Sequence, residues 1–168
     1  MKVTIPEEDF SKDVSNINQE TIADLVCQYT NAIDSVKQRK NEWDKTKLII
    51  ATHLKSITDV FTIGWSVSDT DNNVILQFPA SNIGSKSQSL ILHNGCLIYL
   101  PLVNGFIQVT VIQPYVTEPN GKSAALVNTI IDVCDTNEAS DDKRINNHIK
   151  RFLKELTRWH EKKPSPAQ

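Results

Sequence analysis

The residues best suited to chemistry are His93 and Cys96, which flank the dipeptide Asn94-Gly95. Asn-Gly between apolar runs favours a tight hairpin turn, so the two side chains are expected to face each other across a hairpin. A thiol beside an imidazole is the minimum arrangement for a cysteine nucleophile, because the base generates the thiolate. However, Cys96 begins the apolar run Cys96–Val103, where a buried, unreactive cysteine is the common outcome. Catalysis and a purely structural role both stay open.

Two other segments resemble ligand-binding loops but lack required residues. Gly121-Lys122-Ser123 has the Lys and Ser of a phosphate-binding loop, but Val116 occupies the position of the earlier glycine. Asp69–Asn73 begins like a calcium loop, but Val74 replaces its glycine and Ala80 replaces its final glutamate. Turns explain both segments, so neither a cofactor nor a metal is expected.

The last helical pattern of the sequence predicts a helix with a basic face. Residues 143–163 contain eight Lys or Arg against two Glu. An apolar stripe repeats every three or four residues and consists of Ile145, Ile149, Phe152, Leu153, Leu156 and Trp159. The opposite face carries Arg144, His148, Arg151, Arg158 and Lys162.

This basic face has four open interpretations. It suits an acidic protein partner, nucleic-acid phosphates, an anionic membrane surface or simple solvation. Nucleic-acid binders usually add interleaved aromatic residues and a basic overall charge, whereas this chain has a net charge of −2. A protein partner is therefore favoured over nucleic acid.

A second helical pattern covers residues 18–57, where Gly and Pro are absent. Asn18 is the expected N-cap, with Glu20 in the first turn. The stripe advances in steps of four and three through Ile22, Val26, Tyr29, Ile33, Val36, Lys40, Trp43, Lys47, Ile50, Leu54 and Ile57. One continuous helix would be about 60 Å long, against about 40 Å for a compact domain of this size. A break near Lys40–Asn41 is therefore favoured.

A continuous helix remains the alternative, and it would need a partner along its stripe. Self-association or partner binding is then expected through four stripe residues: Ile33, Val36, Trp43 and Ile50.

The centre of the chain predicts an antiparallel sheet of about five strands. Phe61–Val67 and Val74–Phe78 form one hairpin, and Pro79–Gln88 follows as a loop. The two dipeptides Asn94-Gly95 and Asn104-Gly105 favour type I′ turns. They separate three apolar runs, Leu90–His93, Cys96–Val103 and Phe106–Ile112, and so predict a three-stranded meander. Pro101 predicts a bend or a sheet edge at that point.

Residues 122–134 fit a helix and a strand almost equally well. Helical spacing connects Ala124, Val127, Ile131 and Cys134, while strand spacing connects Val127, Thr129, Ile131 and Val133. Ser123–Leu126 is a good helix start, so a helix is favoured. Asp135–Asp142 is expected to be a loop.

The composition bounds the class of protein. The 168 residues, 39% hydrophobic and 23% charged, are typical of one globular domain, here α+β over residues 1–163 with a tail at 164–168. Three scattered cysteines predict neither a disulfide framework nor a zinc site. The sequence shows no signal peptide and no apolar run of membrane-spanning length, so a cytoplasmic location is expected.

These observations predict a non-enzymatic interaction protein of the adaptor, chaperone-like or inhibitor type. Its expected partner is another protein or a second copy of itself in a homodimer. The alternatives are an enzyme that uses Cys96 with His93, and nucleic-acid binding through Arg144, Arg151 and Arg158.

Overall fold

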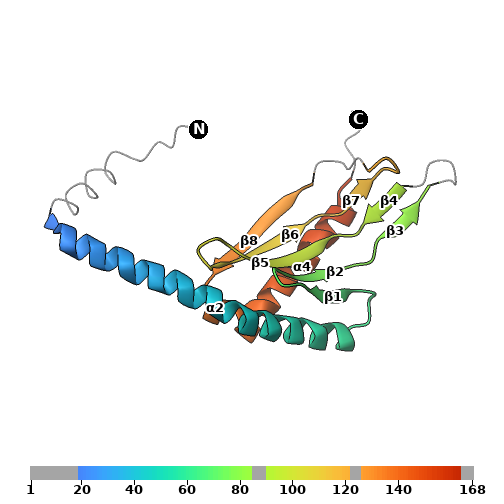
Figure 1. Ribbon diagram of the computed structural model, residues 1–168. Coiled ribbons are helices and arrows are strands. Elements are labelled where there is room, and N and C mark those ends of the chain that lie inside the picture. Colours follow the sequence, from blue (N-terminus) through green and yellow to red (C-terminus); the bar gives the residue numbers. More distant parts are fainter. Residues whose placement is uncertain (1–18, 85–89, 122–125, 164–168) are drawn as a thin grey trace. The chain divides into compact units, whose positions relative to one another are not determined.

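The computed structural model describes residues 19–84, 90–121 and 126–163 of the chain (Figure 1). Residues 1–38 and residues 39–168 form two compact units. The described part of the first unit is helical. The second unit holds all the described strands, together with helices α3 and α4 and the remainder of α2.

Helix α2 runs from Ile22 to Val60, so the expected break near Lys40–Asn41 is wrong. The segment contains neither Gly nor Pro, and Lys is a good helix former, so nothing local interrupts the hydrogen-bond ladder. The helix is capped by Thr21, whose Oγ1 accepts from the Asp24 N–H at 3.1 Å while Asp24 Oδ2 accepts from the Thr21 N–H at 3.2 Å. Asn18, the predicted cap, lies outside the described residues.

The strands form two antiparallel sheets, which confirms the α+β class. The five-stranded sheet has the order β1-β2-β5-β6-β8. Its members are β1 (Ser66–Asp69), β2 (Val74–Gln77), β5 (Cys96–Pro101), β6 (Ile107–Ile112) and β8 (Asn128–Cys134). The three-stranded sheet has the order β3-β4-β7, with β3 (Ser81–Ile83), β4 (Leu90–His93) and β7 (Tyr115–Thr117).

Asn104-Gly105 forms the predicted hairpin, which joins β5 to β6. The Gly105 N–H donates to the Leu102 carbonyl at 2.8 Å, and the Leu102 N–H donates to the Phe106 carbonyl at 2.7 Å. Gly105 has φ +83°, but no non-glycine residue of the described chain has a positive φ. The turn therefore matches a loop closed by a glycine bulge rather than a type I′ turn, which needs a positive φ at both central residues.

Asn94-Gly95, in contrast, connects the two sheets. Strand β4 pairs with β3 and β7, and β5 pairs with β2 and β6. Each strand thus has both edges occupied by other partners. The predicted three-stranded meander is wrong for this reason.

Gly95 is closely packed in the connection between β4 and β5, because a Cβ there would lie 2.5 Å from Leu156 Cδ2 and 3.1 Å from the Ile112 carbonyl oxygen. Gly95 also has φ +95°, which is unfavourable for other residues.

We expect Gly95→Ala to lower the free energy of unfolding by about 2–4 kcal/mol, from backbone strain plus overpacking, in urea denaturation followed by circular dichroism. The control is Gly121→Ala, where φ is +81° and nothing lies within 4 Å, so only the backbone cost of about 1–2 kcal/mol is expected. Equal losses in the two variants would contradict the packing argument.

Residues 128–134 form strand β8, so the preference for a helix was wrong there; residues 122–125 lie outside the described part. The β-branched run of Thr129, Ile130, Ile131 and Val133 suits a strand, and β6 offers a free edge for it. Pro101 ends β5 opposite Ile107, beyond the last β2–β5 pair. The predicted sheet edge at Pro101 is thereby confirmed.

Three smaller expectations also need correction. Residues 61–65 precede β1 and are not a strand, and the expected loop 79–88 contains β3. Strand β7 was not predicted. The expected loop 135–142 contains helix α3 (Thr136–Ala139), which Asp135 and Glu138 close as a capping box.

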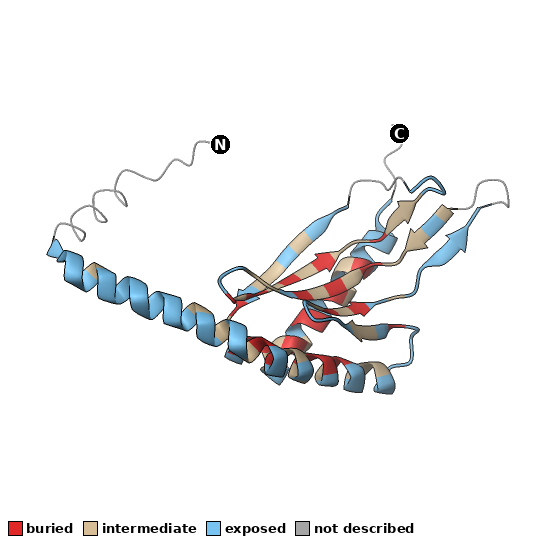
Figure 2. Cartoon of the chain, in the orientation of Figure 1, coloured by how far each residue is buried: buried red, intermediate tan, exposed pale blue. Residues whose placement is uncertain are grey.

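Helix α4 (Asp142–Glu161) confirms the predicted last helix and begins at the N-cap Asp141. Within the second unit, α4 packs on one face of the five-stranded sheet, and the later part of α2 contributes to the same buried core (Figures 1 and 2). The buried sheet residues are Val74, Leu76, Leu97, Tyr99, Ile107, Val109, Val111 and Cys134, and the helices add Trp43, Ile50, Ala51, Leu54, Ala139, Ile145, Ile149, Phe152 and Leu156. This packed core fixes the position of α4 against the sheet.

Candidate functional site

His93 and Cys96 lie in different sheets. His93 in β4 is opposite Tyr115 of β7, and the two rings stack with centroids 4.3 Å apart. Cys96 in β5 is opposite Gln77 on one side and Ile112 on the other. The expectation that His93 and Cys96 face each other across a hairpin is therefore wrong.

The environment of Cys96 also disfavours a nucleophilic role. Burial raises the pKa of the Cys96 thiol to about 11, because desolvation penalises the thiolate. Near neutral pH the group therefore remains protonated. The geometry thus gives the cysteine chemistry neither a base nor an ionised thiol.

Two members of the predicted basic face are engaged inside the protein. Arg144 donates from Nε to Asp132 Oδ2 at 2.7 Å and from Nη2 to Asp132 Oδ1 at 2.9 Å. A further guanidinium N–H of Arg144 donates to Glu138. These charge-assisted bonds hold the pKa of Asp132 well below its usual range.

His148 is only 4% exposed, so its expected place on the exposed basic face is wrong. Its Nε2 lies 2.7 Å from Asp132 Oδ2, and its Nδ1 lies 2.9 Å from the Tyr99 hydroxyl. An ionised carboxylate only accepts, so Nε2–H donates to Asp132 and, in the neutral ring, Nδ1 accepts from Tyr99. Burial lowers the pKa of His148, although Asp132 opposes this shift. The group of Asp132, Arg144, His148 and Tyr99, here called the Asp132 network, ties α4 to the sheet.

Asp132 and Tyr99 were not predicted as members of this network. A usable signal existed, because Asp132 is a charged residue inside the strand-like run Asn128–Cys134. A carboxylate in such a run is expected to find a cationic or hydrogen-bonding partner. The sequence alone does not show that Arg144 and His148 of α4 lie beside Asp132 of β8.

The other basic residues of α4 are exposed. Arg151 donates from Nη1 to the Ile131 carbonyl at 3.4 Å, and Arg158 pairs with Glu155 at 3.4 Å with a side chain that is 75% exposed. Lys143, Lys150, Lys154 and Lys162 are exposed as well. The exposed cations of this region therefore extend along the whole length of α4.

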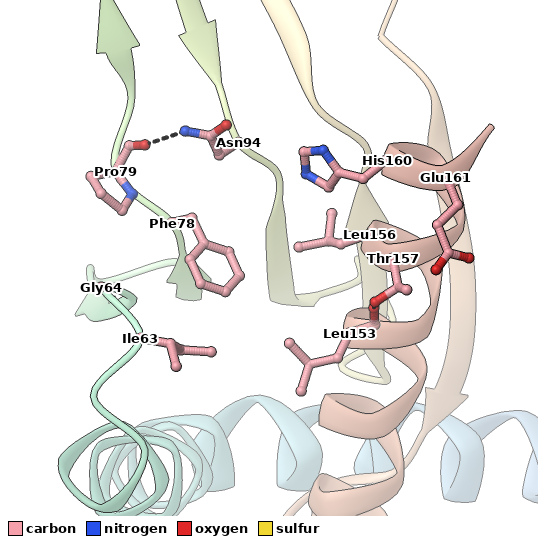
Figure 3. A pocket seen from close by; sticks show the side chains of 10 residues that line it. All are labelled: Ile63, Gly64, Phe78, Pro79, Asn94, Leu153, Leu156, Thr157, His160 and Glu161. Carbon is pink, nitrogen blue, oxygen red and sulfur yellow. Dashed lines mark hydrogen bonds between the residues drawn. The ribbon is translucent and has the colours of Figure 1, made fainter. Parts of the chain in front are cut away.

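An apolar groove lies beside α4. Its first hollow, of about 580 Å³ (Figure 3), is lined by Ile63, Gly64, Phe78, Pro79, Asn94, Leu153, Leu156, Thr157, His160 and Glu161. A second hollow, of about 400 Å³, is lined by Ile57, Phe61, Ile63, Trp65, Asn146, Ile149, Lys150 and Leu153. The two share Ile63 and Leu153, and together they are called the α4 groove.

The wall opposite α4 is held in place by local bonds. The Trp65 Nε1–H donates to the Phe61 carbonyl at 2.6 Å, which closes the turn after α2. Phe78 stacks between Trp65 and Phe152 with centroids 5.8 and 6.1 Å away. The Asn94 amide donates to the Pro79 carbonyl at 2.6 Å (Figure 3). The groove is thus preformed by the packing and bonds of this unit.

In the first unit, the apolar stripe of α2 is exposed. Ile22 is 81% exposed, Val26 57%, Tyr29 68% and Ile33 36%, and Val36 is half-buried. These five residues are called the α2 stripe. In contrast, Trp43 and Ile50 are buried in the core of the second unit, so their expected availability to a partner is corrected.

Within residues 19–84, 90–121 and 126–163, no three His, Cys, Asp or Glu side chains come together as a metal site. The same part of the chain contains no helix long and apolar enough to cross a membrane. Comparison with protein-family models, curated proteins and solved structures gives no match. The geometry of the chain itself is therefore the ground for assigning a function.

Proposed function

We propose that this protein is a non-enzymatic interaction protein that self-associates through the α2 stripe. The observation behind the proposal is the exposure of large apolar side chains on one face of a helix, at Ile22, Val26, Tyr29 and Ile33. A contiguous exposed apolar face is typical of an interaction surface. The partner of such a face in a homodimer is the same face of a second copy.

The spacing of the α2 stripe is that of a coiled coil. Its residues advance by four, three, four and three positions, a mean of about 3.5, which keeps one seam facing a partner helix. In heptad terms Val26 and Ile33 occupy a positions, where β-branched residues favour two strands. The next seam position is Lys40, and a charged residue there limits the seam and costs stability.

This proposal is tested by light scattering and sedimentation over a range of concentrations. The wild-type chain is expected to show a mass above that of the monomer, rising with concentration. Val26→Glu with Ile33→Glu places charges in the seam and is expected to give monomer throughout, because burying unpaired carboxylates is unfavourable.

The matched control is Gln28→Glu with Ser35→Glu, which adds the same two charges at exposed positions outside the stripe. It is expected to associate like the wild type. A wild-type chain that remains monomeric at its highest attainable concentration would refute self-association. Equal loss in the control would instead point to a general effect of charge.

An adaptor-like role with a further protein partner extends the same proposal. Nucleic acid is the weaker candidate partner, because Arg144 is committed to Asp132 and Glu138. We place the protein in the cytoplasm, where the free thiols of Cys27, Cys96 and Cys134 would stay reduced.

A further inference from the structure

The α4 groove presents apolar surface that the core does not use. Phe61 is 57% exposed and Ile63 is 56% exposed, and they lie on the wall opposite α4. On the helix side, Leu153 contributes to both hollows. Figure 3 shows Ile63 and Phe78 facing Leu153 and Leu156 across the opening. A concave surface of this kind is suited to receiving apolar side chains.

Several polar groups in and around the groove already have partners within the protein. The Asn94 amide is bonded to Pro79, the Thr157 hydroxyl to the Leu153 carbonyl at 2.8 Å, and the Trp65 N–H to Phe61. A strongly polar small molecule would therefore find few of these groups free to orient it. The interior favours aliphatic or aromatic groups instead.

One border of the groove is basic. A third hollow, lined by Leu153, Lys154, Thr157, Arg158, Glu161 and Lys162, shares Leu153, Thr157 and Glu161 with the first. Lys150 lines the second hollow. Cations thus stand on successive turns of α4 beside the apolar surface. A partner that fills the groove would place its own flanking residues against these cations, and acidic residues are complementary to them.

The length and shape of the groove fit a helix. It follows α4 from Asn146 to Glu161, about 22 Å at 1.5 Å per residue. It is bounded by a helix and by the loop at residues 61–65, whose side chains form its walls, so binding would depend on side chains rather than on a free strand edge. Amphipathic helices bind such grooves through apolar residues at three- and four-residue intervals.

We propose that the α4 groove binds an amphipathic helical segment of another protein, with apolar residues on one face and acidic residues beside them. The proposal concerns the second unit only and does not depend on self-association through the α2 stripe. A flat membrane would fit a projecting apolar surface better than this recessed one.

The test uses the full chain and two fluorescein-labelled synthetic peptides of about 18 residues, roughly five helical turns. Both carry Leu at alternating three- and four-residue steps; one has Glu at most other positions and the second has Lys. In fluorescence anisotropy the acidic peptide is expected to bind and the basic peptide to remain free. Added salt should weaken binding, because the rim charges are exposed.

Two variants localise the binding. Lys154→Glu with Arg158→Glu should weaken binding of the acidic peptide by about tenfold to a hundredfold, through like-charge repulsion at the rim. The matched control is Lys45→Glu with Lys55→Glu, which makes the same charge change at exposed positions of α2 and should leave affinity within about twofold. Ile63→Ser removes an exposed apolar contact without altering charge and should also weaken binding.

Other outcomes overturn the proposal. Absence of acidic-peptide binding at low salt, or equal weakening by the control pair, would remove the groove as a docking site. Binding to vesicles of phosphatidylcholine and phosphatidylserine that the acidic peptide does not displace would favour a membrane surface instead. The Val26→Glu and Ile33→Glu variant should bind the peptide like the wild type, which separates this proposal from self-association.

Discussion

Replacing Asp132 with alanine should lower the free energy of unfolding by about 2–4 kcal/mol. Removal of the carboxylate leaves the Arg144 guanidinium with Glu138 as its remaining acidic partner, and it leaves the buried His148 without the acceptor for its Nε2–H. Breaking a fully buried charge pair costs about 3–5 kcal/mol. The lower figure is appropriate because the side chain of Arg144 is 34% exposed and solvent screens part of the interaction.

Urea denaturation followed by circular dichroism measures this loss, with an unchanged dependence on urea expected if the folded state keeps its compactness. A suitable control is Arg158→Ala, which breaks the pair with Glu155 by removing a side chain that is 75% exposed. That change should cost less than about 1 kcal/mol. Similar losses from Asp132→Ala and Arg158→Ala would show that the Asp132 network contributes no more than an exposed pair.

A double-mutant cycle separates the pairwise interaction from the cost of leaving one partner unmatched. Arg144→Ala alone leaves Asp132 bonded to His148, and the double variant removes both charges. We expect the double variant to be less destabilised than the sum of the two single variants, because the second change removes a charge that has already lost its partner.

The difference between the two Asn-Gly dipeptides shows how far local signals reach. Both predict a turn, and both occur where strands end. Only Asn104-Gly105 joins two paired strands; at Asn94-Gly95 the neighbouring strands pair elsewhere. Strand β2 pairs with the edge of β5, and β7 pairs with the edge of β4, that a β4–β5 hairpin would use. The short sequence separation of β4 and β5 does not reveal this competition between strands.

The apolar stripes of α2 and α4 were predictable because residue spacing along a helix is local information. The apolar stripe of α4 correctly gave its buried residues Ile145, Ile149, Phe152 and Leu156. The same periodicity could not place His148, which occupies the predicted polar face but is buried because Asp132 and Tyr99 satisfy its two ring nitrogens. For α2, the spacing gave one stripe, but only the fold divides it into an exposed part at residues 22–33 and a buried part at Trp43 and Ile50.

The α4 groove had no single signal in the sequence. Its walls come from the end of α2, the end of β2, the connection between β4 and β5 at Asn94, and α4, which are distant in the chain. Exposed apolar residues after a helix, such as Phe61 and Ile63, predict at most a site of contact. The basic residues of α4 were visible in the sequence, but their position beside an apolar hollow depends on the tertiary packing.

Acidification should destabilise the folded state in two stages, both through the Asp132 network. Burial lowers the pKa of His148 below its ordinary value of 6.5, so the unfolded chain binds a proton at higher pH than the folded chain. Stability is therefore highest above pH 6.5 and declines as the pH falls through the folded pKa. Asp132 behaves in the same sense at lower pH, because its folded pKa lies well below 3.8. Its contribution is present above pH 3.8 and is lost as the pH falls below that value.

Urea titrations at a series of pH values measure both stages. His148→Gln should reduce stability at neutral pH but remove most of the decline that begins near pH 6.5, because no imidazole remains to be protonated at this site. The control His160→Gln changes an exposed residue at the end of α4 and should leave the wild-type profile intact. A decline that persists unchanged in His148→Gln would assign the first stage to other groups. The second stage should survive in His148→Gln, since Asp132 keeps Arg144 as the main cause of its lowered pKa, and should be reduced in Asp132→Ala.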